Sequence, residues 1–176
     1  MLTGNPQAIE LVPYDPRWPR IFDSESGRIR SSLGSLALSL EHVGSTSVPG
    51  LIAKPIIDIC LVVLDSSRED AYLAKLEDIG YAVSVREPEW FEHRMLQRTA
   101  PEVNLHIFSA DCAEVARMRL FRDWLRGAPE DVRLYAETKP RLAKRTWASV
   151  QEHADAKSDI VAEISTRAEA GVRGAG

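Results

Sequence analysis

Residues 56–64 constrain the fold more than any other stretch of the chain, because they are apolar at every position except Asp58. An apolar run of this length is typical of a β-strand that is buried on both faces. Such a strand lies inside a sheet that other elements cover on both sides. The lone carboxylate needs a cation or several hydrogen-bond donors to offset the cost of its burial.

The rest of the chain alternates between helical and strand-like patterns. Ser67 with Asp70, and Asp111 with Glu114, resemble the side-chain pairs that cap helix N-termini. We expect helices from about residue 19 to 40 and at 67–80, 111–127 and 129–170, and strands at 40–43, 55–64, 81–85, 93–98 and 103–108. This order predicts an α/β or α+β fold with a mixed sheet covered by helices, in one domain spanning residues 1–176 with frayed ends at 1–7 and 171–176.

Composition excludes several classes of protein. With 22 basic and 26 acidic side chains the chain carries a net charge of −4, which argues against broad electrostatic binding of duplex nucleic acid. The longest apolar run is far shorter than the roughly 20 residues of a membrane span, and the first residues lack the pattern of a secretory signal. Cys60 and Cys112 have no neighbours at zinc-site spacing, which favours free thiols. We expect a cytoplasmic protein with no membrane partner.

The loop before the apolar strand has the composition of an anion site. Gly44, Ser45, Thr46 and Ser47 follow a short strand, and Gly50 closes this part of the loop. Glycine lets the backbone approach a phosphate closely, and hydroxyl and N–H groups donate hydrogen bonds to its oxygens. The alternative is a tight connection between two strands, since Gly-Ser pairs are common in turns.

Several motifs, taken together, carry a family resemblance over nearly the whole chain, from about Ile9 to Ala168. They are Glu41-His42-Val43-Gly44-Ser45-Thr46-Ser47-Val48-Pro49-Gly50, Lys54-Pro55-Ile56-Ile57-Asp58-Ile59, His93-Arg94-Met95, Asn104-Leu105-His106-Ile107-Phe108, Phe121-Arg122-Asp123-Trp124-Leu125-Arg126 and Ala156-Lys157. The sequence resembles the GrpB-like proteins, a family placed by fold within the nucleotidyltransferase superfamily. The resemblance implies a small mixed sheet packed by helices.

The resemblance also implies a metal site, but an incomplete one. Active members of the superfamily carry a Gly-Ser or Gly-Gly pair, then two carboxylates on one strand and a third on a later strand. Asp58 matches the first of these, whereas Cys60 stands in place of the second and His106 is the polar residue of the later strand. The implied catalytic residues are Asp58 and His106, with Asp58 holding a divalent metal, Mg²⁺ or Mn²⁺ before Zn²⁺. Two-metal catalysis needs several carboxylates, and Glu41 is the first candidate to supply another.

Each of these residues also has a structural interpretation. Cys60 is more typical of a small buried hydrophobe than of a ligand, and His106 is as consistent with a hydrogen bond inside the sheet as with a site. If Cys60 does belong to the site, the two-residue period of a strand places it on the same side as Asp58. We expect Asp58 to face the same cleft as Ser45.

Basic residues beside the motifs are the expected phosphate ligands. The cations that stand at these positions are Lys54, Arg94, Arg122, Arg126, Lys139 and Lys157, of which Lys54, Arg94, Arg122 and Lys157 complete the expected ligand set with Gly44, Ser45, Thr46 and Ser47. Each one alone is more typical of a solvated surface charge or of an ion pair with Asp123, Glu130 or Glu137.

Two functions are consistent with the sequence. The first is a protein that binds a nucleotide or another phosphorylated small molecule on a nucleotidyltransferase-like fold, with metal-dependent nucleotidyl or phosphoryl transfer as its possible reaction. The alternative is a catalytically incomplete relative that serves as a metabolite-binding or protein-interaction domain, which the missing second carboxylate favours. The sequence leaves the oligomeric state and the acceptor substrate open.

Overall fold

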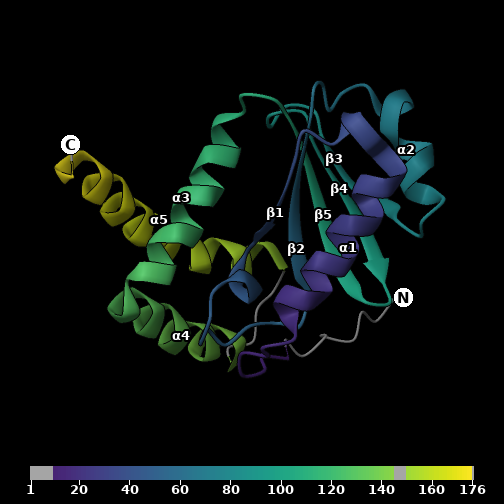
Figure 1. The fold of residues 1–176 in the computed structure, drawn as a ribbon. Coiled ribbons are helices and arrows are strands. Elements are labelled where there is room, and N and C mark those ends of the chain that lie inside the picture. Colours follow the sequence, from purple (N-terminus) through teal and green to yellow (C-terminus); the bar gives the residue numbers. More distant parts are fainter. Residues whose placement is uncertain (1–9, 145–149, 176) are drawn as a thin grey trace, which may run out of the picture.

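The computed structural model of the protein describes residues 10–144 and 150–175, and it contains one mixed β-sheet (Figure 1). The strand order is β1-β2-β5-β4-β3, with β2 and β5 parallel and the other neighbours antiparallel. The strands are β1 Ser39–Val43, β2 Ile57–Val63, β3 Ala82–Glu87, β4 His93–Thr99 and β5 Glu102–Ser109. The predicted α/β class and all five predicted strands are confirmed.

Helices lie on both sides of the sheet (Figure 1). They are α1 Trp18–Leu33, α2 Glu69–Glu77, α3 Ala113–Gly127, α4 Pro129–Lys144 and α5 Val150–Gly174, with single 3-10 turns η1 Gly34–Leu36 and η2 Ser45–Ser47. Helices α1 and α2 contact each other on one side, and α3, α4 and α5 pack together on the other. No described helix is long and apolar enough to cross a bilayer.

Strand β2 divides its side chains between two apolar clusters. Ile57, Ile59 and Leu61 are buried in the larger cluster, beneath α1 and α2. Cys60 and Val62 point to the opposite face and pack in a smaller cluster against α3. The prediction of a strand buried on both faces is therefore confirmed, and period two places Asp58 on the side of α3, α4 and α5.

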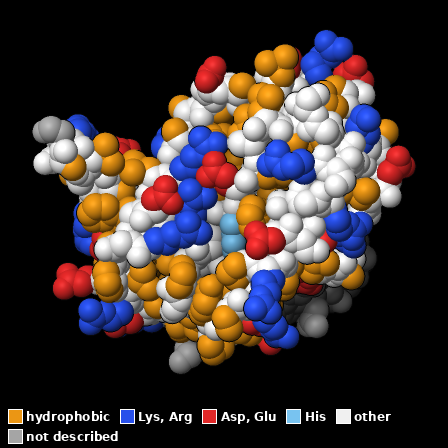
Figure 2. Space-filling model, in the orientation of Figure 1, with side chains coloured by type: hydrophobic (Ala, Val, Ile, Leu, Met, Phe, Trp, Pro, Cys, Tyr) orange, Lys and Arg blue, Asp and Glu red, His pale blue; other side chains and the backbone are white. Residues whose placement is uncertain are grey.

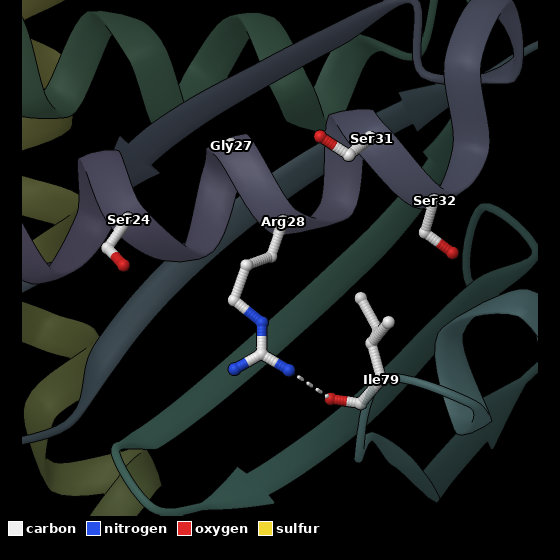
Figure 3. A pocket seen from close by; sticks show the side chains of 6 residues that line it. All are labelled: Ser24, Gly27, Arg28, Ser31, Ser32 and Ile79. Carbon is white, nitrogen blue, oxygen red and sulfur yellow. Dashed lines mark hydrogen bonds between the residues drawn. The ribbon is translucent and has the colours of Figure 1, made fainter.

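Polar contacts join α1 to the second half of the sheet and to α2. The Glu25 carboxylate, almost fully buried, accepts hydrogen bonds from Arg98 Nη1 at 2.7 Å and from the Tyr81 hydroxyl at 2.8 Å. At the shallow pocket of Figure 3, Arg28 Nη2 donates to the carbonyl oxygen of Ile79 at 3.0 Å, and the Ser32 hydroxyl also lines this pocket. These contacts belong to the packing of α1 and lie away from the Gly44 loop.

Both predicted helix caps are wrong. Helix α2 begins after Arg68, and the Ser67 hydroxyl and N–H both donate to Asp65 instead of capping the helix. Helix α3 follows Cys112 without a side-chain cap, while Asp111 has a positive φ of 60°. In both places the polar residue that the pattern assigned to the helix N-terminus belongs instead to a turn that precedes the helix.

Helix boundaries differ from the predictions at three other points. Gly34, which the helical pattern included, ends α1 with a φ of 58°. The predicted last helix is two helices, and α5 continues to Gly174 through residues that we expected to be frayed. The expected fraying of residues 1–7 and of residue 176 falls outside the described residues.

Acidic and basic side chains are interspersed on the face of the molecule shown in Figure 2, with apolar side chains between them. His42, on β1, is almost fully buried. Its ring stacks on Phe22 with 5.1 Å between ring centroids, and its Nε2 lies 2.9 Å from the Thr46 hydroxyl. Burial, reinforced by the charge of Arg126, lowers the pKa of His42 to about 4.

Substituting His42 by Gln should reduce the acid sensitivity of the fold. The pKa of His42 is lower in the folded than in the unfolded chain, so the unfolded state takes up a proton as pH falls from about 6.5 to 4. Stability is therefore lost across this range, by up to about 1.4 kcal/mol per pH unit. Urea unfolding of wild type and variant at pH 7.5 and 4.5 measures the difference. An identical pH dependence in both proteins would contradict this account.

Candidate functional site

The site begins where β1 ends, because the pairing of β1 with β2 places Val43 opposite Asp58. Gly44 follows with a φ of 71°, and a Cβ atom added there would lie 2.5 Å from Asp58 Oδ2. No other residue type fits this position without movement of the backbone or of the carboxylate. The loop therefore leaves the sheet in direct contact with Asp58.

Two of the three loop hydroxyls hold the loop itself. The Thr46 hydroxyl contacts His42 Nε2, and the Ser47 hydroxyl donates to the Gly44 carbonyl oxygen at 2.5 Å. Both side chains are buried. Farther along, Val48 and Leu51 anchor the loop in an apolar cluster formed with α3, α4 and α5. The Ser47 N–H also donates to the Gly44 carbonyl oxygen, so Ser47 offers a ligand neither its hydroxyl nor its N–H. Ser45 keeps the half-buried hydroxyl of the loop.

Lys139, from α4, lies against Ser45. Its Nζ is 2.5 Å from Ser45 Oγ and 3.0 Å from the carbonyl oxygen of Ile52, and only 5% of the residue is exposed. Burial, together with the charge of Lys157, lowers the pKa of Lys139 to about 7, although Asp58 acts in the opposite direction.

Three lysines from three segments converge at this point. Burial and the charge of Lys157 also lower the pKa of Lys54. Lys157, on α5, and Lys139 share the Tyr135 ring, with Nζ atoms 5.8 Å and 4.8 Å from its centroid. Among the residues whose side chains the structure describes, none of the three lysines forms an ion pair with a carboxylate. The site is a cluster of cations beside the loop, and the Asp58 carboxylate lies close enough to act on the charges of Lys54 and Lys139 without forming an ion pair with either.

Sequence reasoning named Lys139 as a nearby cation but left it out of the ligand set. Tyr135 and Lys139 are four residues apart, so both lie on one face of α4. Since Tyr135 is apolar and buried, this spacing was the available signal that Lys139 is buried too.

Asp58 ends a chain of polar side chains that crosses the sheet. Its Oδ1 accepts a hydrogen bond from Asn104 Nδ2 at 3.3 Å and lies 3.2 Å from His106 Nε2. His106 Nδ1 is 3.1 Å from His93 Nε2, and His93 Nδ1 donates to the Glu87 carboxylate at 2.7 Å. His106 is therefore within hydrogen-bond distance of side chains inside the sheet, and it also lies beside Asp58, the expected site residue. The structure is consistent with both the structural and the site interpretation of His106.

The donor set beside Asp58 does not fit the expected metal site. Cys60 is almost fully buried, and burial raises the pKa of its thiol to about 12. Glu41, opposite Cys60 on β1, forms ion pairs with Arg119 and Arg122. No group of three or more His, Cys, Asp or Glu side chains that could hold an ion occurs in the described ranges. One carboxylate cannot clamp two ions.

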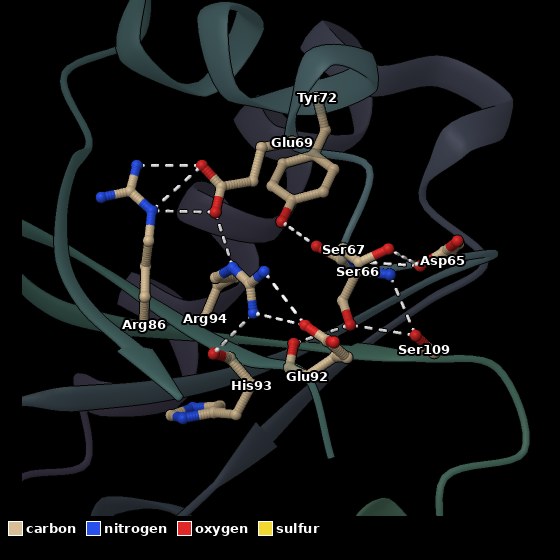
Figure 4. A network of polar contacts seen from close by, with 10 residues as sticks. All are labelled: Asp65, Ser66, Ser67, Glu69, Tyr72, Arg86, Glu92, His93, Arg94 and Ser109. Carbon is tan, nitrogen blue, oxygen red and sulfur yellow. Dashed lines mark hydrogen bonds and ion pairs between the residues drawn. The ribbon is translucent and has the colours of Figure 1, made fainter. Parts of the chain in front are cut away.

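The two arginines expected to bind phosphate are occupied elsewhere. Arg94 lies on the opposite face of the sheet, toward α2, where its guanidinium pairs with Glu69 at 2.6 Å and with Glu92 at 3.1 Å (Figure 4). Arg122 pairs with Glu41 and donates to the His42 carbonyl oxygen. The alternation of β4 explains the first placement, because His93 and Arg94 must face opposite sides.

The family model described as "GrpB protein" matches residues 8–167. The chain belongs to the GrpB family. It is 56% identical over 163 residues to a UPF0157 protein of Halalkalibacterium halodurans, a match that covers 93% of this chain and 84% of that protein. The crystal structure of GrpB from Enterococcus faecalis superposes with a TM-score of 0.80 at 30% identity, over 90% of this chain and 96% of that one.

A more distant likeness defines the wider fold of this GrpB chain. The Cid1 poly(U) polymerase superposes with a TM-score of 0.55 at 12% identity, over 77% of this chain and 44% of that one. At this identity the likeness concerns the fold alone. The GrpB fold is therefore nucleotidyltransferase-like, as the resemblance implied.

Replacing Gly44 by Ala tests the contact with Asp58, with Gly50 as the matched control. Both glycines have a positive φ, but a Cβ at Gly50 would meet no atom within 4 Å. Gly50→Ala should therefore lower the free energy of unfolding only by the conformational cost of a positive φ, about 1–2 kcal/mol. Gly44→Ala should lower it clearly more. Chemical unfolding measures the loss of unfolding free energy in each variant. When both glycine substitutions are made in an Asp58→Ala background, the two losses should become more alike, because the carboxylate that clashes with the Cβ of Ala at position 44 is gone. Equal losses from the two single substitutions would show that Asp58 does not constrain the loop.

Proposed function

We propose that the protein binds a phosphorylated small molecule, in the first place a nucleotide, at the Gly44–Gly50 loop. The observation that carries the proposal is the convergence of Lys54, Lys139 and Lys157 without an ion-paired carboxylate among the described residues. Placing like charges together and removing one of them from water costs free energy. A polyanionic ligand offsets that cost, because it neutralises the cluster and supplies acceptors for the ammonium groups of Lys54 and Lys157.

A nucleotide is favoured over a simple anion by the fold. Cid1, which shares the architecture, has 3′-dATP and Mg²⁺ bound in its structure. In this chain the corresponding sheet carries Asp58 against the Gly44 loop, with Cys60 and His106 where the family resemblance leads us to expect further carboxylates, and three lysines lie nearby. The charge that metal ions would supply to a triphosphate is here available from side chains. Binding without metal-dependent transfer is therefore the function that the site supports best.

Charge removal at the lysines should weaken nucleotide binding. We expect Lys54→Gln and Lys157→Gln each to raise the Kd for ATP about tenfold, a change of about 1.4 kcal/mol that is ordinary for a charge-assisted hydrogen bond. Lys75→Gln, an exposed position at the end of α2, is the matched control and should leave the Kd unchanged. Isothermal titration calorimetry measures all four proteins. Equal Kd values, or no heat of binding in wild type, would overturn the proposal.

Binding of inorganic phosphate with and without Mg²⁺ separates the two candidate functions. The lysine cluster should bind phosphate equally well in EDTA and in millimolar Mg²⁺, because the described donors do not form a metal site. Asp58→Asn should leave this affinity the same or improve it, since a negative charge beside the cluster is removed. Tighter binding in Mg²⁺ that is lost in Asp58→Asn would instead favour the metal-dependent transferase predicted from the family resemblance.

A further inference from the structure

The contact between Ser45 and Lys139 is more than an anion site requires. Lys139 Nζ has two polar neighbours in the described structure, Ser45 Oγ and the carbonyl oxygen of Ile52. A carbonyl oxygen can only accept, so Lys139 directs one N–H to Ile52. A neutral amine has a lone pair as well as N–H groups, and the Ser45 hydroxyl can donate its hydrogen to that lone pair. In this arrangement the serine has a base.

The groups around Lys139 determine whether its neutral form is accessible. Asp58 from β2 and the Tyr135 ring from α4 favour the ammonium form. Burial favours the neutral amine, and so do the charges of Lys157 on α5 and of Lys54 in the loop. The balance is a pKa of about 7. The neutral amine is therefore accessible beside Ser45 near neutral pH.

Ser45 is also the loop hydroxyl that is positioned to react. The Thr46 and Ser47 hydroxyls are buried and bonded to other groups of the protein, whereas Ser45 is half-buried. It directly follows Gly44, whose contact with Asp58 fixes the start of the turn. A serine within hydrogen-bond distance of a base has the arrangement of an activated nucleophile.

We propose that Ser45 is a nucleophile toward phosphorus, with Lys139 as its general base, and that its substrate is a phosphate anhydride such as a nucleoside triphosphate. This inference rests on the proposed function, because it assigns a reaction to the same site. It does not depend on a metal ion.

The proposed step balances within the site. The Ser45 Oγ–P bond forms while the anhydride P–O bond breaks, and the electron pair of that bond leaves with the nucleoside diphosphate if Ser45 is phosphorylated, or with pyrophosphate if Ser45 is nucleotidylated. The proton of the Ser45 hydroxyl passes to Lys139 Nζ and from there to the leaving group. Lys54 and Lys157 stabilise the negative charge that develops on the leaving group. The product is a phosphorylated or nucleotidylated Ser45.

A fluorophosphonate probe tests the nucleophile directly on the whole protein. The probe is uncharged, and attack by Ser45 forms the Oγ–P bond and expels fluoride. We expect a single adduct in the intact mass, located at Ser45 by peptide mass spectrometry and prevented by ATP. Ser45→Ala should remove the adduct, and Ser67→Ala, at an exposed serine before α2, should retain it. An unlabelled protein, an adduct elsewhere, or no protection by ATP overturns the proposal.

The pH dependence identifies Lys139 as the base even if a substitution of this buried lysine impairs folding. The labelling rate of wild type should rise with pH to a plateau, with a midpoint near 7 where Lys139 loses its proton. Lys54→Gln removes a neighbouring positive charge and should move the midpoint to higher pH, while Lys75→Gln should not. Lys139→Gln, if folded, should label at least about 100-fold more slowly. A rate that is independent of pH, or a midpoint unchanged in Lys54→Gln, contradicts the assignment.

Failure of this inference is distinguishable from failure of the proposed function. If calorimetry shows lysine-dependent ATP binding but Ser45 is not labelled, the anion site stands and the nucleophile is wrong. If ATP does not bind at all, the proposed function is wrong, and the assignment of a nucleoside triphosphate as the substrate of Ser45 is wrong as well.

Discussion

The contact between Gly44 and Asp58 is the constraint on which the rest of the site depends. Because β1 and β2 pair with Val43 opposite Asp58, the chain must leave the sheet directly over a carboxylate, and only a residue without a side chain fits there. That exit fixes the start of the loop. Val48 and Leu51 then anchor its remainder among α3, α4 and α5. A loop held at both ends is preorganised, so less ordering is needed when a ligand binds.

The three lysines of the site come from the loop and from the helices that pack beside it. Lys54 comes from the loop, whereas Lys139 and Lys157 come from helices that pack on the same side of the sheet. Their mutual repulsion and partial burial oppose folding. Burial of the apolar clusters on both faces of the sheet offsets this unfavourable free energy. Lysine pKa values lowered by burial and by neighbouring charges, as at Lys54 and Lys139, often mark functional sites.

The sequence predicts the elements whose signal is local and leaves out those that depend on tertiary contacts. The apolar run around Asp58 specifies β2, and the Gly-Ser pair before it specifies the loop. The caps at Ser67 and Asp111 were wrong because nearby turns use the same side chains. Arg94 was misplaced because a basic residue beside a motif says nothing about which face of a strand it occupies. The role of Lys139 could not be read without knowing that α4 packs against Ser45.

The central claim is that the lysine cluster binds the phosphates of a nucleotide. A crystal structure with a non-hydrolysable ATP analogue tests it most directly, because it shows which basic side chains contact the phosphates. The account predicts phosphate oxygens between Lys54 and Lys157, within hydrogen-bond distance of the Ser45 hydroxyl. A competing cationic location is the cavity of about 450 Å³ that Arg122 and Arg126 line together with Ser47 and Pro49. Phosphates bound at those arginines, with the three lysines untouched, would contradict the account.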